Sequence, residues 1–246
     1  MIHAGVADSR QWNNEFVRFA DSNRVLRYDM REYGRSEPVE GEFSNLQDLA
    51  ALLDFLRLER PVILMGCSMG GGLALDYALE RPAEVKALIL VGSGPRGLEL
   101  DVPISPKFAE AEEAYEAGDL DRVAEIEAEI WFDGEGRTPD QVDPAMRRLA
   151  YEMNRKALGH DAKHLGKRLP DTAVPGAERL SSLQIPLLIV VGANDTPHVR
   201  AAADHMMNQV PSARKAIIQD AAHMPNMDHP EEFSRIVAEF LDSMIV

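Results

Sequence analysis

The sequence predicts an α/β fold, in which a mostly parallel sheet has helices on both faces and carries a helical cap insertion. Short β-type runs alternate with longer stretches whose apolar residues recur at helical spacing. The chain has 246 residues, enough for one large domain with a full core. Five runs are expected to form strands: residues 24–28, 61–65, 87–91, 186–191 and 215–219.

Two helices are well marked in the sequence. The stretch "SNLQDLAALLDFLRL" begins at Ser44, a residue type that caps helix N-termini, and its leucines fall on one face. The last helix is predicted over residues 230–243, because it opens with proline and two glutamates and carries a regular apolar stripe. Both helices are expected to pack against the sheet.

The alternation stops between residues 95 and 180, where the chain is acidic and helical without a convincing strand. We therefore predict a division into a core of residues 1–94 and 181–246 and a cap segment of residues 95–180 over one end of the sheet. Most of the cap charge is expected to face water. Its apolar residues are expected to pack on the core, and Trp131, Phe132 and Met153 are candidates for lining a substrate pocket.

Composition narrows the classes of partner. With 26 Lys and Arg against 41 Asp and Glu, the formal charge of −15 repels nucleic acid and anionic membranes. The single cysteine cannot form an internal disulfide, and the sequence has neither a bilayer-length apolar run nor a leader pattern. We expect a cytoplasmic protein that binds neither nucleic acid nor membrane. Its oligomeric state is not predicted.

A nucleophile motif lies where an expected strand meets a helical pattern. In "VILMGCSMGG", residues 66–70 match Gly-x-Ser-x-Gly in a strand, turn and helix context. Such a turn exposes the oxygen of Ser68 and aims the Met69 N–H at the site where an oxyanion forms. The alternative is a tight strand-to-helix crossing at which Ser68 is merely small. Cys67 is expected to be a core residue.

A serine nucleophile needs a base and an acid that orients it. Asp195 follows the apolar run "PLLIVVG", and His223 follows the run "KAIIQ" before the final helix. The chain order serine, aspartate, histidine is typical of this architecture. Because loops after parallel strands share one edge of the sheet, we expect Ser68, Asp195 and His223 to converge there.

Other residues compete for these roles. Asp220 also follows the last strand, but it is too close in sequence to His223 to be its usual partner. The remaining histidines considered are expected to be non-catalytic: His160, His164, His198, His205 and His229. The sequence has no cluster with convincing metal-ligand spacing, so no metal is predicted.

Together these motifs resemble the α/β-hydrolase superfamily, and more narrowly its capped esterase and enol-lactonase-like members. The resemblance covers nearly the whole chain and includes "HAGVADSRQW", "YDMREYGRSEP", the elbow around Ser68, and "AAHMPNMDHPEEF". It implies that the N–H groups of Gly5 and Met69 form an oxyanion hole. It also implies an ester or lactone hydrolase that acts on a small molecule without a cofactor.

One departure from the family concerns the strand before "HAGVADSRQW", the segment that resembles the family's oxyanion loop. Only Met1 and Ile2 of that strand are present. In the family this strand lies between those matching residues 24–28 and 61–65. Its loss predicts a gap of roughly 9–10 Å, two strand spacings. We expect the sequence to be an N-terminally shortened version of a longer natural chain.

The sequence leaves two alternatives to an ester or lactone hydrolase. Carbon–carbon bond hydrolases of the superfamily share the triad. A hydrolase-like ligand-binding protein could also keep the triad and turn over slowly. The serine at position 68 argues against the relatives that use an aspartate nucleophile.

Overall fold

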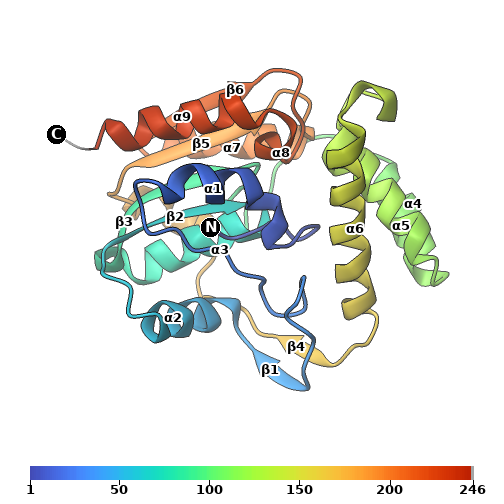
Figure 1. Cartoon of the computed structure of the whole chain (residues 1–246), viewed down its shortest axis with the longest axis horizontal. Helices are drawn as coiled ribbons and strands as arrows, with labels where there is room; N and C mark the ends of the chain where they lie inside the picture. The colour runs from blue at the N-terminus through green and yellow to red at the C-terminus, as the bar shows by residue number, and fades with distance from the viewer. Residues whose placement is uncertain (245–246) are drawn as a thin grey trace.

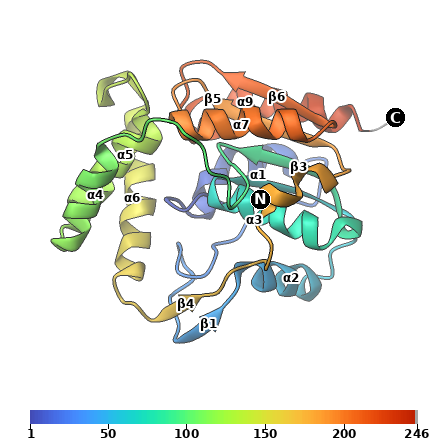
Figure 2. The ribbon, with the colours of Figure 1, turned by 180° about the vertical axis from the view of Figure 1, so that it is seen from behind.

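Four parallel strands form the central sheet of the computed structural model, which describes residues 1–244. The strand order is β2-β3-β5-β6, and every neighbouring pair is parallel. Helices α2, α3 and α7 cover one face, while α1 and α9 cover the other (Figures 1 and 2). This is the predicted α/β architecture.

The elements follow one another along the chain with these bounds: η1 (Ser9–Trp12), α1 (Asn13–Ala20), β1 (Gly41–Phe43), α2 (Asn45–Phe55), β2 (Val62–Cys67), α3 (Met69–Glu80), η2 (Pro82–Glu84), β3 (Val85–Val91), α4 (Lys107–Glu116), α5 (Leu120–Ala128), η3 (Glu129–Asp133), η4 (Pro139–Gln141), α6 (Pro144–Asp161), β4 (Gly166–Arg168), η5 (Gly176–Ser182), β5 (Leu187–Gly192), α7 (Pro197–Gln209), β6 (Ala213–Ile218), α8 (Pro225–Asp228) and α9 (Pro230–Asp242). Among the helices of residues 1–244, none is both long and apolar enough to cross a bilayer.

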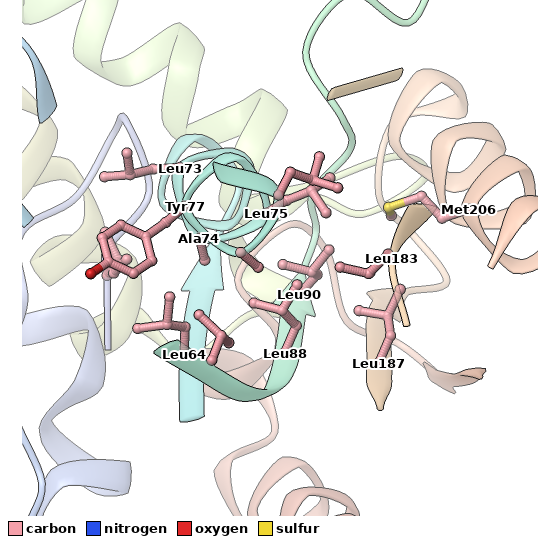
Figure 3. Close-up of a cluster of buried hydrophobic side chains, with 14 of the residues drawn as sticks. Leu64, Leu73, Ala74, Leu75, Tyr77, Leu88, Leu90, Leu183, Leu187 and Met206 are labelled. Atoms are coloured by element: carbon pink, nitrogen blue, oxygen red, sulfur yellow. The ribbon is translucent and has the colours of Figure 1, made fainter. Parts of the chain in front are cut away.

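The core consists of two apolar layers separated by the sheet. Successive side chains of a strand point to opposite faces, so Leu88 packs toward α3 and α7 while Ile89 packs toward α9. Leu187 and Leu188 alternate in the same way on β5. Figure 3 shows the first layer, where strand leucines meet the side chains of α3. Burial on both faces explains why these strands read as continuous apolar runs.

Four of the five expected strands are present, with ends shifted by at most two residues. They are β2, β3, β5 and β6. Helix α2 begins at the predicted cap, where Ser44 Oγ accepts a hydrogen bond of 3.3 Å from the Gln47 N–H. The last helix also lies where the sequence places it.

The prediction of a strand over residues 24–28 is wrong. This segment has no ladder partner, because a groove of about 660 Å³ separates it from the open edge of β2. The first two residues of the chain lie at this space: Met1 N donates to Leu26 O, and Ile2 forms a parallel bridge with Gly66. The predicted gap is therefore a groove that neighbouring segments do not close.

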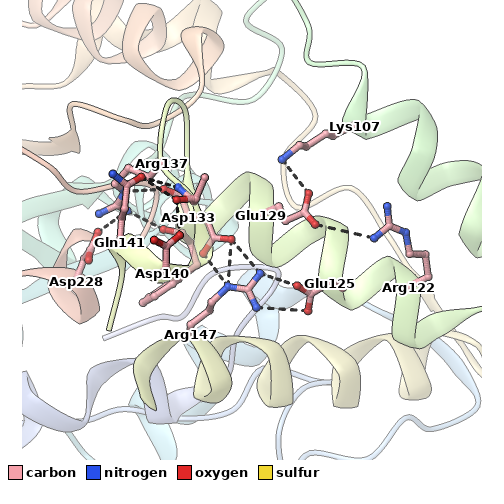
Figure 4. Close-up of polar contacts among 12 residues, drawn as sticks. Lys107, Arg122, Glu125, Glu129, Asp133, Arg137, Asp140, Gln141, Arg147 and Asp228 are labelled. Atoms are coloured by element: carbon pink, nitrogen blue, oxygen red, sulfur yellow. Dashed lines mark hydrogen bonds and ion pairs between the residues drawn. The ribbon is translucent and has the colours of Figure 1, made fainter. Parts of the chain in front are cut away.

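The cap segment holds three helices, α4, α5 and α6, which lie together beside one end of the sheet (Figure 1). Ion pairs join them: Arg147 of α6 bonds both Asp133 and Glu125 (Figure 4). Asp133 is buried, so part of the cap charge is internal instead of facing water. The cap segment also contains a strand the sequence does not indicate, β4, which pairs in parallel with β1.

Candidate active site

Ser68 lies on a sharp turn between β2 and α3. Its backbone has φ 50° and ψ −116°, a conformation that a non-glycine residue rarely adopts. Two contacts hold the turn: the Ser68 N–H donates to Val91 O at 2.9 Å, and Ser93 Oγ donates to Ser68 O at 2.8 Å. The strained turn is therefore fixed by the neighbouring strand β3 and the loop after it.

Two glycines of the motif are required by close backbone contacts. A Cβ at Gly66 would lie 2.2 Å from the carbonyl oxygen of Gly70. A Cβ at Gly70 would lie 2.4 Å from the carbonyl oxygen of His3. The absence of side chains lets the strand, the turn and the loop beginning at His3 meet at one point.

Asp195 and His223 form a buried pair at the same edge of the sheet. His223 Nδ1 lies 2.9 Å from Asp195 Oδ2 and 3.1 Å from Oδ1. Asp195 follows β5, and Thr196 N donates to its Oδ1 at 2.7 Å. Both side chains are almost fully buried. The carboxylate is thus placed to hold the proton of His223 on Nδ1 and leave Nε2 as the acceptor.

Ser68 and His223 line one cavity of about 380 Å³. Trp131 forms part of the cavity wall, and its ring centroid lies 4.4 Å from that of His223. The carbonyl oxygen of Trp131 also accepts a hydrogen bond of 3.2 Å from the backbone N–H of His223. Within residues 1–244, no hydrogen bond joins Ser68 Oγ to the His223 ring. In enzymes without bound substrate this contact is often long, and it shortens in the reacting complex.

Gly5 and Met69 meet at the N-terminus of α3. The position of a Cβ on Gly5 would be 3.7 Å from the Met69 side chain, in ordinary contact. The Ala4 N–H donates to Gln11 Oε1 at 2.9 Å, which fixes the loop. Of these two predicted oxyanion-hole residues, Met69 lines the 380 Å³ cavity in the described structure and Gly5 does not.

Comparison with known proteins shows the family to which the chain belongs. Residues 1–236 match the sequence model of the alpha/beta hydrolase family. The chain belongs to that family. The expected resemblance is therefore confirmed at the level of the family.

Individual relatives of this alpha/beta hydrolase differ in their named activities. The chain is 26% identical over 254 residues to a 2-hydroxy-6-oxononadienedioate/2-hydroxy-6-oxononatrienedioate hydrolase of Pseudomonas putida, covering 98% of this chain and 86% of that protein. It is 27% identical to a pimeloyl-[acyl-carrier protein] methyl ester esterase of Aeromonas hydrophila, covering 98% and 94%. The enol-lactonase of Burkholderia xenovorans LB400 has the same fold, with a TM-score of 0.77, 19% identity, and coverage of 98% and 89%.

A buried polar network that no sequence motif indicates joins the two loops of the hydrolase site. Asn226, three residues after His223, donates from Nδ2 to Gln11 O at 2.9 Å and to Glu15 Oε2 at 3.2 Å. Gln11 Nε2 in turn donates to Asn226 Oδ1 at 3.3 Å. Burial raises the pKa of Glu15 from 4.5 to about 7, against the opposing effect of the Asn226 hydrogen bond. The network ties the loop of Gly5 to the loop of His223.

His3 is a second supporting residue, and it was not among the predicted site residues. Its Nδ1 lies 2.8 Å from Ala4 O, and its Nε2 accepts the Met30 N–H at 3.0 Å. Burial lowers the pKa of His3, although its hydrogen bond to Ala4 and nearby carboxylates oppose the shift. The neutral ring therefore joins the two chain segments. The sequence signal for this role is the position of His3 at the start of the segment "HAGVADSRQW".

Cys67 and Asp220 are not placed to act as nucleophile or as the acid that orients His223. Cys67 is fully buried, and burial raises the pKa of its thiol to about 12, so it remains protonated at neutral pH. Asp220 is exposed on a turn with φ 57°, and its carbonyl accepts a hydrogen bond from Arg137. The structure pairs Asp195, not Asp220, with the His223 ring.

The other histidines have separate environments. His160 Nδ1 lies 3.0 Å from Glu32 O, and His229 immediately precedes α9. His198 lies in α7 and lines the cavity, and the expectation that it is non-catalytic stays a prediction. Across residues 1–244, no three His, Cys, Asp or Glu side chains converge as metal ligands would.

Two of the three predicted pocket residues do not line the cavity. Trp131 does, but Phe132 and Met153 are buried in the core layer that includes Ala150 and Met224. The cause is local, because Trp131 and Phe132 are neighbours on the π-helical turn η3 and point in different directions. The predictions for Phe132 and Met153 are therefore corrected: both are packing residues.

Proposed function

We propose that this hydrolase cleaves a small carboxylic ester or lactone with Ser68 as nucleophile, His223 as base and Asp195 as orienting acid. The observation that carries the proposal is the buried contact of 2.9 Å between His223 Nδ1 and Asp195, on a histidine that shares a cavity with Ser68. The strained turn at Ser68 supports it further.

The first half of the reaction forms an acyl-enzyme. Ser68 Oγ bonds to the substrate carbonyl carbon while His223 Nε2 takes the hydroxyl proton. Asp195 stabilises the resulting imidazolium through Nδ1. As the tetrahedral intermediate collapses, the carbon–oxygen bond to the alcohol breaks, and His223 returns the proton to that leaving oxygen.

Water completes the cycle. His223 Nε2 removes a proton from a water molecule as its oxygen bonds to the acyl carbon, and Ser68 leaves with that proton. In both halves of the reaction the negative oxygen accepts hydrogen bonds from the backbone N–H groups of Met69 and Gly5. One such donor contributes about 2.7–4 kcal/mol to transition-state stabilisation.

A carbon–carbon bond hydrolase is the second candidate. It is favoured by the similarity over 98% of the chain to the Pseudomonas putida protein, whose name gives an oxo-dienedioate and oxo-trienedioate as substrates. The esterase and lactonase names among the other relatives support the first candidate. A direct comparison of a 4-nitrophenyl ester with a 2-hydroxy-6-oxo-dienoate on the same preparation distinguishes the two.

Labelling with a fluorophosphonate tests the nucleophile without knowledge of the substrate. We expect one phosphonyl group on Ser68 in wild type, none in Ser68→Ala, and full labelling in Cys67→Ala. Hydrolysis of 4-nitrophenyl acetate is expected to disappear in Ser68→Ala. Equal rates in wild type and Ser68→Ala would contradict the mechanism, and a burst followed by near-zero turnover would indicate a ligand-binding protein instead.

A further inference from the structure

The cavity that contains Ser68 and His223 also contains a guanidinium group with unused hydrogen-bonding capacity. Arg168 ends the short strand β4, which pairs with β1 and places Arg168 beside Phe43. The Leu169 N–H donates to Phe43 O at 2.7 Å and fixes the chain just after it. The Arg168 side chain is 35% exposed and lines the cavity wall.

Arg168 has two polar contacts in the described structure. Its Nη2 donates to Asp171 Oδ2 at 2.9 Å, and its Nη1 contacts Met69 Sδ at 3.1 Å. A thioether sulfur is a weak acceptor, and a guanidinium carries five N–H donors in a planar fork. Several donors of Arg168 are therefore free to bind a ligand in the cavity.

The partner carboxylate of Arg168 also lines the cavity, but it is more deeply buried than the guanidinium and has further hydrogen-bond donors. Asp171 is 1% exposed, and its Oδ1 already accepts from Ser44 Oγ and from the Leu46 N–H at the start of α2, both at 3.0 Å. The N-terminus of α2 thus stabilises part of the negative charge of Asp171. The guanidinium of Arg168 is therefore more accessible to a ligand in the cavity than this carboxylate, which is almost fully buried.

The other guanidinium of the cavity serves as a comparison. Arg96 donates from Nε to the buried Asp76 at 2.7 Å and from Nη2 to Thr172 Oγ1. Asp76 accepts from Arg96 and lies at 2% exposure, so Arg96 compensates a buried charge. Arg168 differs because its partner, Asp171, also accepts hydrogen bonds from Ser44 and Leu46.

Arg168 also lies next to the reacting position. Its Nη1 contacts the side chain of Met69, whose N–H is the proposed oxyanion donor beside Ser68. An anion bound at Arg168 is therefore joined to a carbonyl at Ser68 by a short connecting chain. A planar fork of N–H donors matches a carboxylate, which it can bind with two hydrogen bonds.

We propose that Arg168 is a specificity-determining residue that binds a carboxylate on the acyl part of the substrate. The inference rests on the proposed function and names its substrate class: half-esters of short dicarboxylic acids, and lactones that carry a free carboxylate. Local charge at Arg168 selects these anions in spite of the net charge of −15 on the chain.

The test compares two esters with acyl chains of five carbons, mono-4-nitrophenyl glutarate and 4-nitrophenyl pentanoate, after subtraction of the uncatalysed rates. Wild type is expected to favour the glutarate ester in kcat/KM, and Arg168→Gln is expected to reduce the ratio of the two values at least tenfold, mainly through KM. Arg168→Lys restores part of the ratio, because it keeps the charge without the fork. Added NaCl lowers the wild-type ratio.

Arg235→Gln on the exposed surface of α9 is the charge-matched control and keeps the wild-type ratio. An unchanged ratio in a folded Arg168→Gln would overturn the inference. Calorimetry provides a test that needs neither turnover nor the variant: wild type is expected to bind monomethyl glutarate at least tenfold more tightly than dimethyl glutarate. Equal affinities also overturn the inference, whereas absence of ester hydrolysis together with selective binding of the anion contradicts the proposed function alone.

Discussion

The indole ring of Trp131 lies against the imidazole ring of His223, with the two centroids 4.4 Å apart and the planes inclined by 41°. The same residue accepts the His223 N–H through its carbonyl oxygen. The cap segment therefore contacts the proposed base through both a side chain and the backbone. Movement of the π-helical turn η3 would move the wall of the cavity and His223 together.

Trp131→Leu tests the side-chain contact. Loss of an aromatic pair removes about 0.5–1.5 kcal/mol, so we expect kcat/KM for a small ester to fall about 2–13-fold. Phe108→Leu is the matched control, since the Phe108 ring also packs on Trp131, with ring centroids 5.5 Å apart. A similar loss in both variants would show that the effect comes from packing of the cap segment.

Asp195→Asn tests the orientation of His223. The amide can no longer stabilise the imidazolium or hold the proton on Nδ1, so kcat for ester hydrolysis is expected to fall on the order of 10⁴-fold. Circular dichroism checks the fold. Asp220→Asn, at the exposed competing position, is expected to keep wild-type kcat. Comparable losses in the two variants would contradict the assignment of Asp195.

Arg137→Met tests the contact between the cap segment and the His223 loop. Arg137 Nη2 lies 2.7 Å from Asp228 Oδ2, and both side chains are less than a tenth exposed (Figure 4). Removing one partner of a buried pair costs about 3–5 kcal/mol of the free energy of unfolding. Adding Asp228→Asn is expected to recover part of this loss, and Arg235→Met on the surface to cost little. Chemical denaturation measures all four proteins.

Glu15→Gln tests the buried network by its dependence on pH. The pKa of Glu15 is about 7 in the folded chain and 4.5 in the unfolded chain, so folding favours the protonated form. This contribution is complete below pH 4.5 and is lost as pH rises through 7. We expect Glu15→Gln to gain stability relative to wild type over that window, on the order of 3 kcal/mol above pH 7. Parallel stability profiles would contradict the shift.

His3→Gln is expected to act in the opposite direction. Burial lowers the pKa of His3 below its ordinary value of 6.5, so the unfolded chain binds a proton more readily than the folded one. Wild type therefore loses stability as pH falls below 6.5, down to the lowered pKa of the folded state. The variant lacks this titration, and its unfolding free energy should fall less between pH 6.5 and 5. Urea melts at several pH values measure the difference.

Much of the sheet and the candidate triad could be predicted because their signals are local and repeated. Buried parallel strands read as apolar runs, and the residues that follow them reach one edge of the sheet. Ser68, Asp195 and His223 follow β2, β5 and β6, and the structure brings the last two into contact. The segment 24–28 has the same kind of pattern but no strand beside it, and a pattern does not supply a hydrogen-bonding partner.

The surroundings of the site could not be predicted in the same way. Helical spacing shows that Trp131, Phe132 and Met153 are apolar positions of the cap segment, but not which of them reaches the cavity. Arg168 lies in a strand of three residues that has no periodicity to detect. Its relation to Met69 exists only because β4 pairs with β1 and returns the chain to the cavity.

The sequence by itself determined the alternation of strands and helices, the strained turn at Ser68, and the chain order of Ser68, Asp195 and His223. Each of these residues is marked by a local motif of neighbouring residues. Tertiary structure alone decided the groove beside β2, the contact of Trp131 with His223, the buried network of Glu15 and the exposure of Arg168. These features depend on which distant segments meet and on how much water they exclude, so neither residue type nor spacing specifies them.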